Sequence, residues 1–466
     1  MRRRSLTGPL ILLVIGGLFL WRNLHPEAPI FDIVALYWPF LLIAWGLLRL
    51  VESLFWTSKG YHTGLSGGEV ILIVFICAVG FGFWQARQHG HRFLMMNGID
   101  LWANQYDYDV SAKASAAGMT RIVFENPRGN IKVTGGDTQD VEISGRKLIR
   151  AWARPEADRL NNETPVEIVP QGDRILVRTN QDRARANRTI SDDLEVVVPR
   201  GLTVESRAVS GDYEISDLTG GVELAADRGD VRLARLGGNA RLDVGRSGLI
   251  RATDVKGNID LTGEGSDLDL ENIGGQVTIN GGYRGALDFK NLAKPLVFEG
   301  RNTELHVQAL PGRISMDLGQ FTGKDLVGPI RLSAHSRDVT VEQFTVSLDV
   351  DTDRGDIELT PGRTPLPSVD ARSGSGRIDL VLPPKASFQL QATAETGDAV
   401  NDFGPPIQKE VTGRTATLAG KSGEGPALRL VAGRGWISVR KEGSAPSTPP
   451  EGEPPKPPNP PKRTEI

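Results

Sequence analysis

Residues 211–228 read GDYEISDLTGGVELAADR, and residues 229–247 read GDVRLARLGGNARLDVGRS. The second stretch nearly repeats the first, with the glycines kept and the charges changed. Further copies begin at Gly248, Ser266, Gly285, Thr303 and Arg337, with shorter relatives at 129–143, 328–336 and 355–362. A repeat that recurs about every twenty residues is typical of a solenoid, in which each copy forms one coil and stacks on the next.

The apolar residues of one copy alternate in two short runs. After Gly229 they are Val231, Leu233, Leu236, Ala240, Leu242 and Val244. Alternation with a period of two predicts two short strands that each bury one face. The glycines between the runs, among them Gly211, Gly229, Gly248 and Gly275, are expected at corners where the backbone needs a positive φ. The predicted fold of this part is all-β, a parallel β-solenoid of 18–19-residue coils. An antiparallel β-sandwich built from hairpins is the alternative.

The first hundred residues differ from the repeats in composition. Apolar runs lie at 7–21, 30–56 and 70–84, and three arginines at positions 2–4 precede the first run. A bilayer core of about 30 Å needs roughly 20 apolar residues, so the two outer runs are short for spans. Arginines before a first span favour a cytoplasmic N-terminus. Residues 1–92 are therefore predicted to be a multi-pass α-helical anchor of three transmembrane helices in the lipid bilayer of the cell membrane.

Three such spans place the rest of the chain outside the cytoplasm, in the periplasm or at the cell surface. We expect a juxtamembrane linker at 93–119, the β-solenoid domain at 120–442 and a proline-rich, disordered tail at 443–466. A charged insertion at 147–163, KLIRAWARPEADRLNNE, is compatible with a helix and is expected to be a lid or a long loop.

The stretches GPLILLVIGGLFLWRNL (8–24) and YWPFLLIAWGLLRLVESL (37–54) resemble the LiaI/LiaF-like transmembrane region of bacterial envelope proteins. The resemblance lies within the first 85 residues or so. It implies a membrane location and, for some family members, a part in envelope-stress responses. No catalytic residue comes with it.

A second resemblance covers roughly residues 120–442. It is carried by VFENPRGNIKVTGG (123–136), DLEVVVPRGLTVESRAVSGDYEIS (193–216), GSGRIDLVLPPKASFQLQATAETGDAVNDFG (374–404) and ALRLVAGRGWISVRKEG (427–443). These phrases are similar to a bacterial candidate-adhesin family of Gly-Asp-rich β-repeats. The resemblance implies the β-repeat fold and an adhesive role, and its motifs are structural glycines and prolines.

The residues that could take part in catalysis or in binding a metal are spaced like solvent-exposed residues of strands. The acids form two groups, Asp260, Asp267, Asp269, Glu271 and Asp349, Asp351, Asp353, Asp356. A glycosidase needs two opposed carboxylates, whereas acids at alternate positions of a strand lie on its solvated face. The stretch TGEGSDLDL (262–270) departs from the calcium-binding repeat at Thr262 and Asp269, and it occurs once.

The histidines do not suggest a site either. His89 and His91 lack further ligands for a metal site, and His306 and His335 lack nearby nucleophiles. The sequence holds no HExxH motif and no Gly-rich phosphate-binding loop of the form GxxxxGK[ST]. No catalytic, cofactor-binding or metal-binding residue is therefore predicted, no cofactor is expected, and the protein is not expected to be an enzyme.

Charge and cysteine content narrow the classes of function. Lys and Arg number 54 against 57 Asp and Glu, and the two signs are interspersed, so nucleic acid is not an expected partner. Cys77 is the single cysteine, so the chain forms no intramolecular disulfide. The leading hypothesis is a non-enzymatic binding, adhesion or scaffolding module of the bacterial cell envelope. Its expected partner is cell-wall polysaccharide or an envelope protein. The alternative is an envelope-stress sensor or regulator that acts through the LiaF-like helices.

Overall fold

The computed structural model describes residues 104–184, 189–362 and 365–444, together with Ile43, Val74 and Cys77. The chain divides into two compact units, Met1–Ala103 and Asn104–Ile466. In the described ranges no helix combines the length and apolar character that crossing a bilayer requires. Apart from those three residues, the predicted spans lie outside the described residues, as does the tail beyond Ser444. The transmembrane spans and the disordered tail therefore stay predictions.

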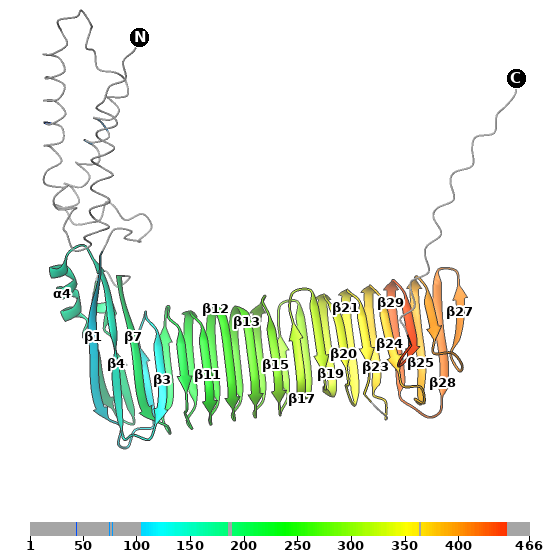
Figure 1. The fold of residues 1–466 in the computed structure, drawn as a ribbon, viewed down its shortest axis with the longest axis horizontal. Helices are drawn as coiled ribbons and strands as arrows, with labels where there is room; N and C mark the ends of the chain where they lie inside the picture. Colours follow the sequence, from blue (N-terminus) through cyan, green and yellow to red (C-terminus); the bar gives the residue numbers. More distant parts are fainter. Residues whose placement is uncertain are drawn as a thin grey trace, which may run out of the picture. The chain divides into compact units, whose positions relative to one another are not determined.

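The second unit is mostly β, and its strands lie side by side in one long row (Figure 1). Its central strands are β8 Thr203–Ala208, β9 Tyr213–Ser216, β10 Val222–Arg228, β11 Val231–Leu236, β12 Ala240–Val255, β13 Ile259–Ile273, β14 Val277–Tyr283, β15 Leu287–Leu292 and β16 Leu296–Glu299. Each pairs in parallel with a strand one repeat away. Val222 pairs with Ala240 and Val231 with Ile250, 18 and 19 residues apart. The strand pairs in residues 203–299 are thus not the hairpins that a sandwich would need.

The alternating apolar residues form the core as predicted. The six apolar residues that follow Gly229 are each no more than 1% exposed. They belong to one continuous hydrophobic cluster that runs from Ala116 to Val439. Because an isolated copy would leave one apolar face in water, the copies are stable only when stacked.

Glycines occupy both corners of the coils, and for different reasons. Gly229 has a φ of +148°, and a Cβ on it would overlap the carbonyl oxygen of Gly211 in the preceding coil. Gly275 does not have a positive φ, but a Cβ there would overlap the carbonyl oxygen of Gly257. Gly248 differs from the expectation, because it lies inside β12 and a Cβ would meet only the Asp230 side chain.

The corner that contains Gly275 also uses residues with side chains in the left-handed conformation. A column of left-handed residues, with φ between 51° and 63°, contains Asp217, Arg235, Asp254, Asn272 and Asn291. Asn and Asp tolerate this conformation better than other residues with side chains. The column is also tied together across coils, since Asn291 donates to Asn272 (2.8 Å) and Asn272 to Asp254 (3.0 Å).

The copy that begins at Thr303 runs in the opposite direction to its neighbours. It forms β17 (Thr303–Met316), which is antiparallel to β15 and β16 on one side and to β18 (Gln320–Lys324) and β19 (Val327–Ser336) on the other. A tight turn, closed by Gly300 N–H donating to the Thr303 carbonyl (2.8 Å), reverses the chain. A uniformly parallel stack was therefore the wrong prediction here. Alternation is the same in both directions along a strand, so the pattern carries no sign of the reversal.

Parallel pairing resumes after the reversed coil. Its strands are β20 Asp338–Glu342, β21 Ser347–Arg354, β22 Ile357–Thr360, β23 Ser368–Ser375 and β24 Ile378–Leu382. The C-terminal strands are β25 Phe388–Thr396, β26 Ala399–Asp402, β27 Gln408–Thr412, β28 Thr415–Ser422, β29 Ala427–Arg434 and β30 Ile437–Lys441. β29 lies between β23 and β25, and β30 lies between β24 and β26, so β29 and β30 are inserted before β25 and β26. β28 and β27 extend the row beyond β25.

The N-terminal end of the row has a matching arrangement. Its strands are β1 Asn104–Ser115, β2 Arg121–Glu125, β3 Ile131–Gly136, β4 Asp140–Ala151, β5 Glu167–Gln171, β6 Arg174–Arg178 and β7 Ile190–Pro199. β2 lies between β6 and β8, and β3 lies between β7 and β9. The antiparallel strands β1 and β4 extend β7 outward.

Two expectations at this end need correction. The segment 93–119 is not simply a linker, because β1 pairs with β4 over its full length and the β unit begins at Asn104. The insertion 147–163 is neither a lid nor a loop. It begins in β4 and continues as helix α4 (Arg154–Glu163), which buries Ala157 and Leu160 against Ile149 of β4. A short 3-10 helix, Gln181–Arg183, precedes β7.

A candidate polar binding pocket

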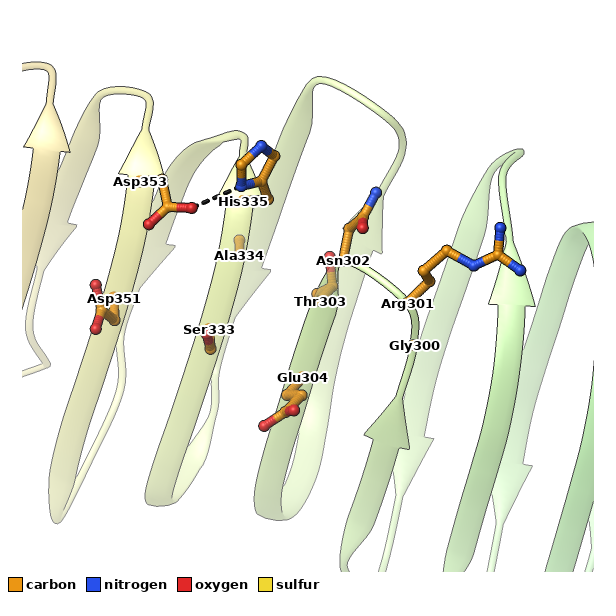
Figure 2. A pocket seen from close by; sticks show the side chains of 10 residues that line it. All are labelled: Gly300, Arg301, Asn302, Thr303, Glu304, Ser333, Ala334, His335, Asp351 and Asp353. Atoms are coloured by element: carbon orange, nitrogen blue, oxygen red, sulfur yellow. Dashed lines mark hydrogen bonds and ion pairs between the residues drawn. The ribbon is translucent and has the colours of Figure 1, made fainter.

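The reversed coil opens a polar pocket on the outer surface of the strand row. The pocket has a volume of about 270 Å³ and lies at the turn between β16 and β17 (Figure 2). The turn contributes Arg301, β17 contributes Thr303 and Glu304, β19 contributes Ser333 and His335, and β21 contributes Asp351 and Asp353. The pocket therefore depends on the change of strand direction.

Strand register brings the side chains of the pocket together. Glu304 is opposite Ser333, and Ser333 is opposite Asp351, so the three form one row across β17, β19 and β21. One step along the strands, Nδ1 of His335 lies 2.6 Å from Oδ2 of Asp353. Figure 2 shows these side chains on the same face of the strands.

Two carboxylates of the pocket lack a partner. Glu304 and Asp351 make no hydrogen bond or ion pair with any described residue, and both are exposed. Many other acids of the outer face pair with bases on neighbouring strands, for example Asp269 with Arg251 (2.9 Å) and Asp288 with Arg313 (2.6 Å), whereas the exposed Glu223 and Asp243 have no such partner among the described residues. The pocket thus holds negative charge that the protein leaves uncompensated.

A buried hydroxyl at the same place is also without a partner. Thr303 is only 5% exposed, and its Oγ1 atom forms no hydrogen bond. Most buried polar atoms in proteins are hydrogen-bonded, so this hydroxyl is an exception. Thr303 alternates with the exposed Glu304 along β17, so its side chain faces the core and not the outer pocket.

Thr303→Val is expected to raise the free energy of unfolding by about 1 kcal/mol, because it removes a desolvated hydroxyl that gains no hydrogen bond. Thr352→Val is the matched control, because the buried Thr352 hydroxyl donates a hydrogen bond to the Arg354 carbonyl (2.9 Å). Loss of this hydrogen bond should lower the free energy of unfolding by a similar amount. Urea denaturation of the two variants measures both changes. A loss of stability in Thr303→Val would mean that its hydroxyl is satisfied.

The residues singled out in the sequence have different places in the structure. Asp351, Asp353 and His335 meet in the pocket, and His306 lies on β17 two residues from Glu304. The other acids have surface roles such as pairing with a base on a neighbouring strand. The pairs are Asp349 with Arg331, Asp356 with Arg377, Asp269 with Arg251 and Glu271 with Lys290. Asp267 accepts a hydrogen bond from the Ala286 N–H.

The remaining predicted positions do not form a site in the described structure. Asp260 and the stretch 262–270 belong to β13, and His89 and His91 lie outside the described residues. No group of three or more His, Cys, Asp or Glu is placed to hold a metal ion within the described ranges. Thr303, Glu304 and Ser333 were missed by the sequence analysis, because nothing in their spacing separates them from other repeat positions.

A second, larger hollow of about 820 Å³ lies over β1, β3, β4, β7 and β9. It carries both signs of charge, and Lys132 pairs with Glu214 across it (3.3 Å). None of the buried, unpartnered polar atoms in the described residues belongs to its lining. The smaller pocket is therefore the better candidate for a specific ligand.

Comparison with protein families gives two matches. Residues 157–427 match the family model described as Toastrack DUF4097, and residues 7–91 match the model of the LiaF transmembrane domain. No curated protein matches the chain.

Among solved structures, the chain is similar to three candidate adhesion proteins. The protein from Clostridium sporogenes is 8% identical, with 72% of this chain and 100% of its own covered and a TM-score of 0.17. The protein from Bacteroides fragilis is 11% identical, with 72% and 97% covered and a TM-score of 0.20. The protein from Parabacteroides distasonis is 10% identical, with 71% and 97% covered and a TM-score of 0.17. TM-scores this low carry no argument about function.

Proposed function

Because the chain belongs to the Toastrack DUF4097 family, we propose that it is a membrane-anchored β protein of the bacterial envelope that binds a polar ligand without catalysing a reaction. The β unit would be a solenoid that lies outside the cytoplasm, and the multi-pass helices would hold it at the membrane. The match of residues 7–91 to the LiaF transmembrane domain supports the anchor.

The observation that carries the binding role is the pocket at the reversed coil. Its carboxylates Glu304 and Asp351 lie in one row with Ser333 between them, and neither forms an ion pair with a described residue. Cell-wall polysaccharide and envelope proteins are the partners we propose for this pocket.

The location is tested by protease accessibility. If the N-terminal helices span three times, protease added to intact spheroplasts is expected to digest the β unit, and a cytoplasmic marker should survive. Protection of the β unit in intact spheroplasts, with digestion after lysis, would place it in the cytoplasm and end the proposal of a role at the wall.

The binding role is tested by sedimentation of the full chain, in nonionic detergent, with isolated cell walls. We expect Glu304→Gln combined with Asp351→Asn to reduce the bound fraction at least fivefold. The control, Glu223→Gln combined with Asp243→Asn, makes the same change of charge at exposed acids of β10 and β12 and should leave binding unchanged. Equal losses in both double variants would mean that overall charge, not the pocket, governs binding.

A regulatory role is the second proposal, and the match to the LiaF transmembrane domain is the observation that favours it. Replacing residues 1–92 with an unrelated three-span anchor distinguishes the two roles. A binding module should keep its association with the wall after the exchange. A regulator should lose its effect on an envelope-stress reporter, because its own helices would have to contact the signalling partner.

A further inference from the structure

We infer that the free edge of β1 joins two copies of this chain, whose β1 strands pair antiparallel about a twofold axis. This association is independent of the pocket and of any ligand. Three features of β1 point to it: the free backbone groups of the strand, its difference from the other edge strands, and the charges that self-pairing would set opposite one another.

The free edge of β1 carries a row of backbone hydrogen-bonding groups. β1 pairs only with β4 among the described strands. Ala116 N–H donates to the Gln139 carbonyl (2.9 Å), in the same register as the pairing of β1 with β4. The residues of an antiparallel strand turn their N–H and C=O groups alternately to its two sides, so the even-numbered residues of β1 bond to β4. The odd-numbered residues, from Gln105 to Ser115, therefore direct these groups to the free edge.

Helix α4 contacts β1 without using these groups. The Tyr108 hydroxyl donates to Asp158 of α4 (2.7 Å), so this contact is made by side chains. Tyr108 is half-buried, whereas its odd-numbered neighbours Asp107 and Asp109 are exposed. No backbone hydrogen bond joins an odd-numbered residue of β1 to another described residue. The edge is thus open to a further strand.

The other edge strands are protected from such pairing. β5, β26 and β27 also pair on one side only among the described strands. β5 contains Pro170, β26 has four residues and β27 has five. Short strands and proline are features that prevent association at the edges of sheets. β1 has twelve residues and contains neither proline nor glycine.

The charges of β1 select one register for self-pairing. Opposed residues of an antiparallel pair share a face, so the two longest overlaps have either Asp109 or Val110 on the twofold axis. The first sets Asp109 opposite its own copy, and like charges directly opposite one another are unfavourable. The second sets Asp107 opposite Lys113 on both sides of the axis. Self-pairing is therefore expected in the register centred on Val110.

Lys113 remains available for this contact. Its ammonium group lies 3.1 Å from Asp140 and 2.7 Å from Glu142, and its side chain is 59% exposed. An ammonium group has three N–H donors, so it can pair with a third carboxylate. Asp107 forms no ion pair with a described residue and accepts a hydrogen bond from Gln105 (3.2 Å). Pairing would thus give Asp107 a counter-charge.

The inner face of β1 also suits this register. Its side chains are half-buried, because β1 is the last strand of its sheet, and Val110 and Ala112 pack against the main hydrophobic cluster. The register sets Val110 beside its own copy and the large Tyr108 beside the small Ala112. A second copy would therefore cover the open end of the core. About twelve backbone hydrogen bonds would join the two strands, a number typical of protein interfaces.

Disulfide cross-linking of the full chain, in the membranes of the cells that express it, tests the pairing. Cys77→Ser first removes the single cysteine. Val110→Cys is then expected to give a disulfide-linked dimer on mild oxidation, because opposed residues at this position have Cα atoms about 4.5 Å apart. Ala114→Cys is the matched control on the same face. It would lie opposite Tyr106, about 27 Å from its own copy, and should stay unlinked.

Further variants in the Val110→Cys chain test the register and the edge. Asp107→Lys should reduce the cross-linked fraction at least about fivefold, because it sets two lysines opposite each other. Asp109→Lys makes the same change of charge opposite Ser111 and should have a much smaller effect. Ser111→Pro removes an N–H at the free edge but no hydrogen bond to β4, so it should abolish the cross-link and leave the urea midpoint nearly unchanged.

Several outcomes would overturn the inference. They are equal cross-linking of Val110→Cys and Ala114→Cys, absence of a link in a folded Val110→Cys chain, and a link that survives Ser111→Pro. A larger effect of Asp109→Lys than of Asp107→Lys would overturn the register. Mass spectrometry of the linked product identifies both chains, and a link to a different protein would overturn self-association in favour of a foreign strand at the same edge.

Discussion

Gly229→Ala is expected to lower the free energy of unfolding by at least about 3 kcal/mol, the largest effect that we predict for a single added methyl group. Gly229 has a φ of +148°, which residues with a Cβ rarely adopt. The new Cβ would also overlap the carbonyl oxygen of Gly211. Relief would require the two coils to separate at this corner, and their parallel strands would then lose hydrogen bonds. Urea denaturation of the full chain in detergent, followed by circular dichroism of the strands, measures the change.

Substitutions at two other glycines separate the cost of an unfavourable backbone conformation from the cost of a close contact between coils. Gly172 has a φ of +64°, but a Cβ there meets nothing within 4 Å, so Gly172→Ala should cost about 1 kcal/mol from conformation alone. Gly201 has neither a positive φ nor a close neighbour, so Gly201→Ala should be nearly neutral. If Gly229→Ala costs no more than Gly172→Ala, the coils do not approach as closely as the structure indicates.

Lys147→Met is expected to lower the free energy of unfolding by about 3 kcal/mol at pH 7, because it leaves a buried carboxylate without its counter-charge. Lys147 and Asp192 have side chains that are 2% and 0% exposed, and Nζ lies 3.8 Å from Oδ1. Lys147 also donates to the Thr164 carbonyl, and Gln181 donates to Asp192 (2.7 Å). Burial raises the pKa of Asp192 to about 6 and lowers the pKa of Lys147.

The pH dependence of this loss has a definite sign. Removing Lys147 removes the charge that lowers the pKa of Asp192, so the pKa of the folded variant rises further above the unfolded value of about 3.8. A group with a raised folded pKa binds protons more tightly in the native state, so stability increases as the pH falls through that pKa. The difference between the variant and the unchanged chain should therefore be smaller at pH 5 than at pH 7.

Second substitutions and a surface control complete this test. Asp192→Asn added to Lys147→Met should recover much of the loss at pH 7, since no buried charge remains. Lys132→Met, at a half-exposed lysine 3.3 Å from Glu214, should change stability by no more than about 0.5 kcal/mol. Urea denaturation at pH 5 and at pH 7 measures the free energy of unfolding of each variant. A loss in Lys147→Met that did not depend on pH would argue against a charged, buried Asp192.

Strand β1 could also have been predicted from the sequence. Tyr106, Tyr108 and Val110 alternate with acids in the segment assigned to the linker, and this is the pattern of β1. The assignment failed because the segment lies between the apolar runs and the first recognised copy, not because its signal was weak. The left-handed corner at Asn272 and Asn291 could also have been predicted, since Asn tolerates that conformation.

The sequence by itself determined the strands of the central coils, their buried faces and the 18–19-residue spacing of their partners. Alternation and repeat length are local properties, and burial of Val231 and Leu233 follows from them directly. Only the tertiary structure decided that β17 runs backwards and that Thr303, Glu304, Ser333 and Asp351 meet beside it. The physical reason is that strand alternation is the same in either direction, while the neighbours of each side chain depend on the direction in which the next coil runs.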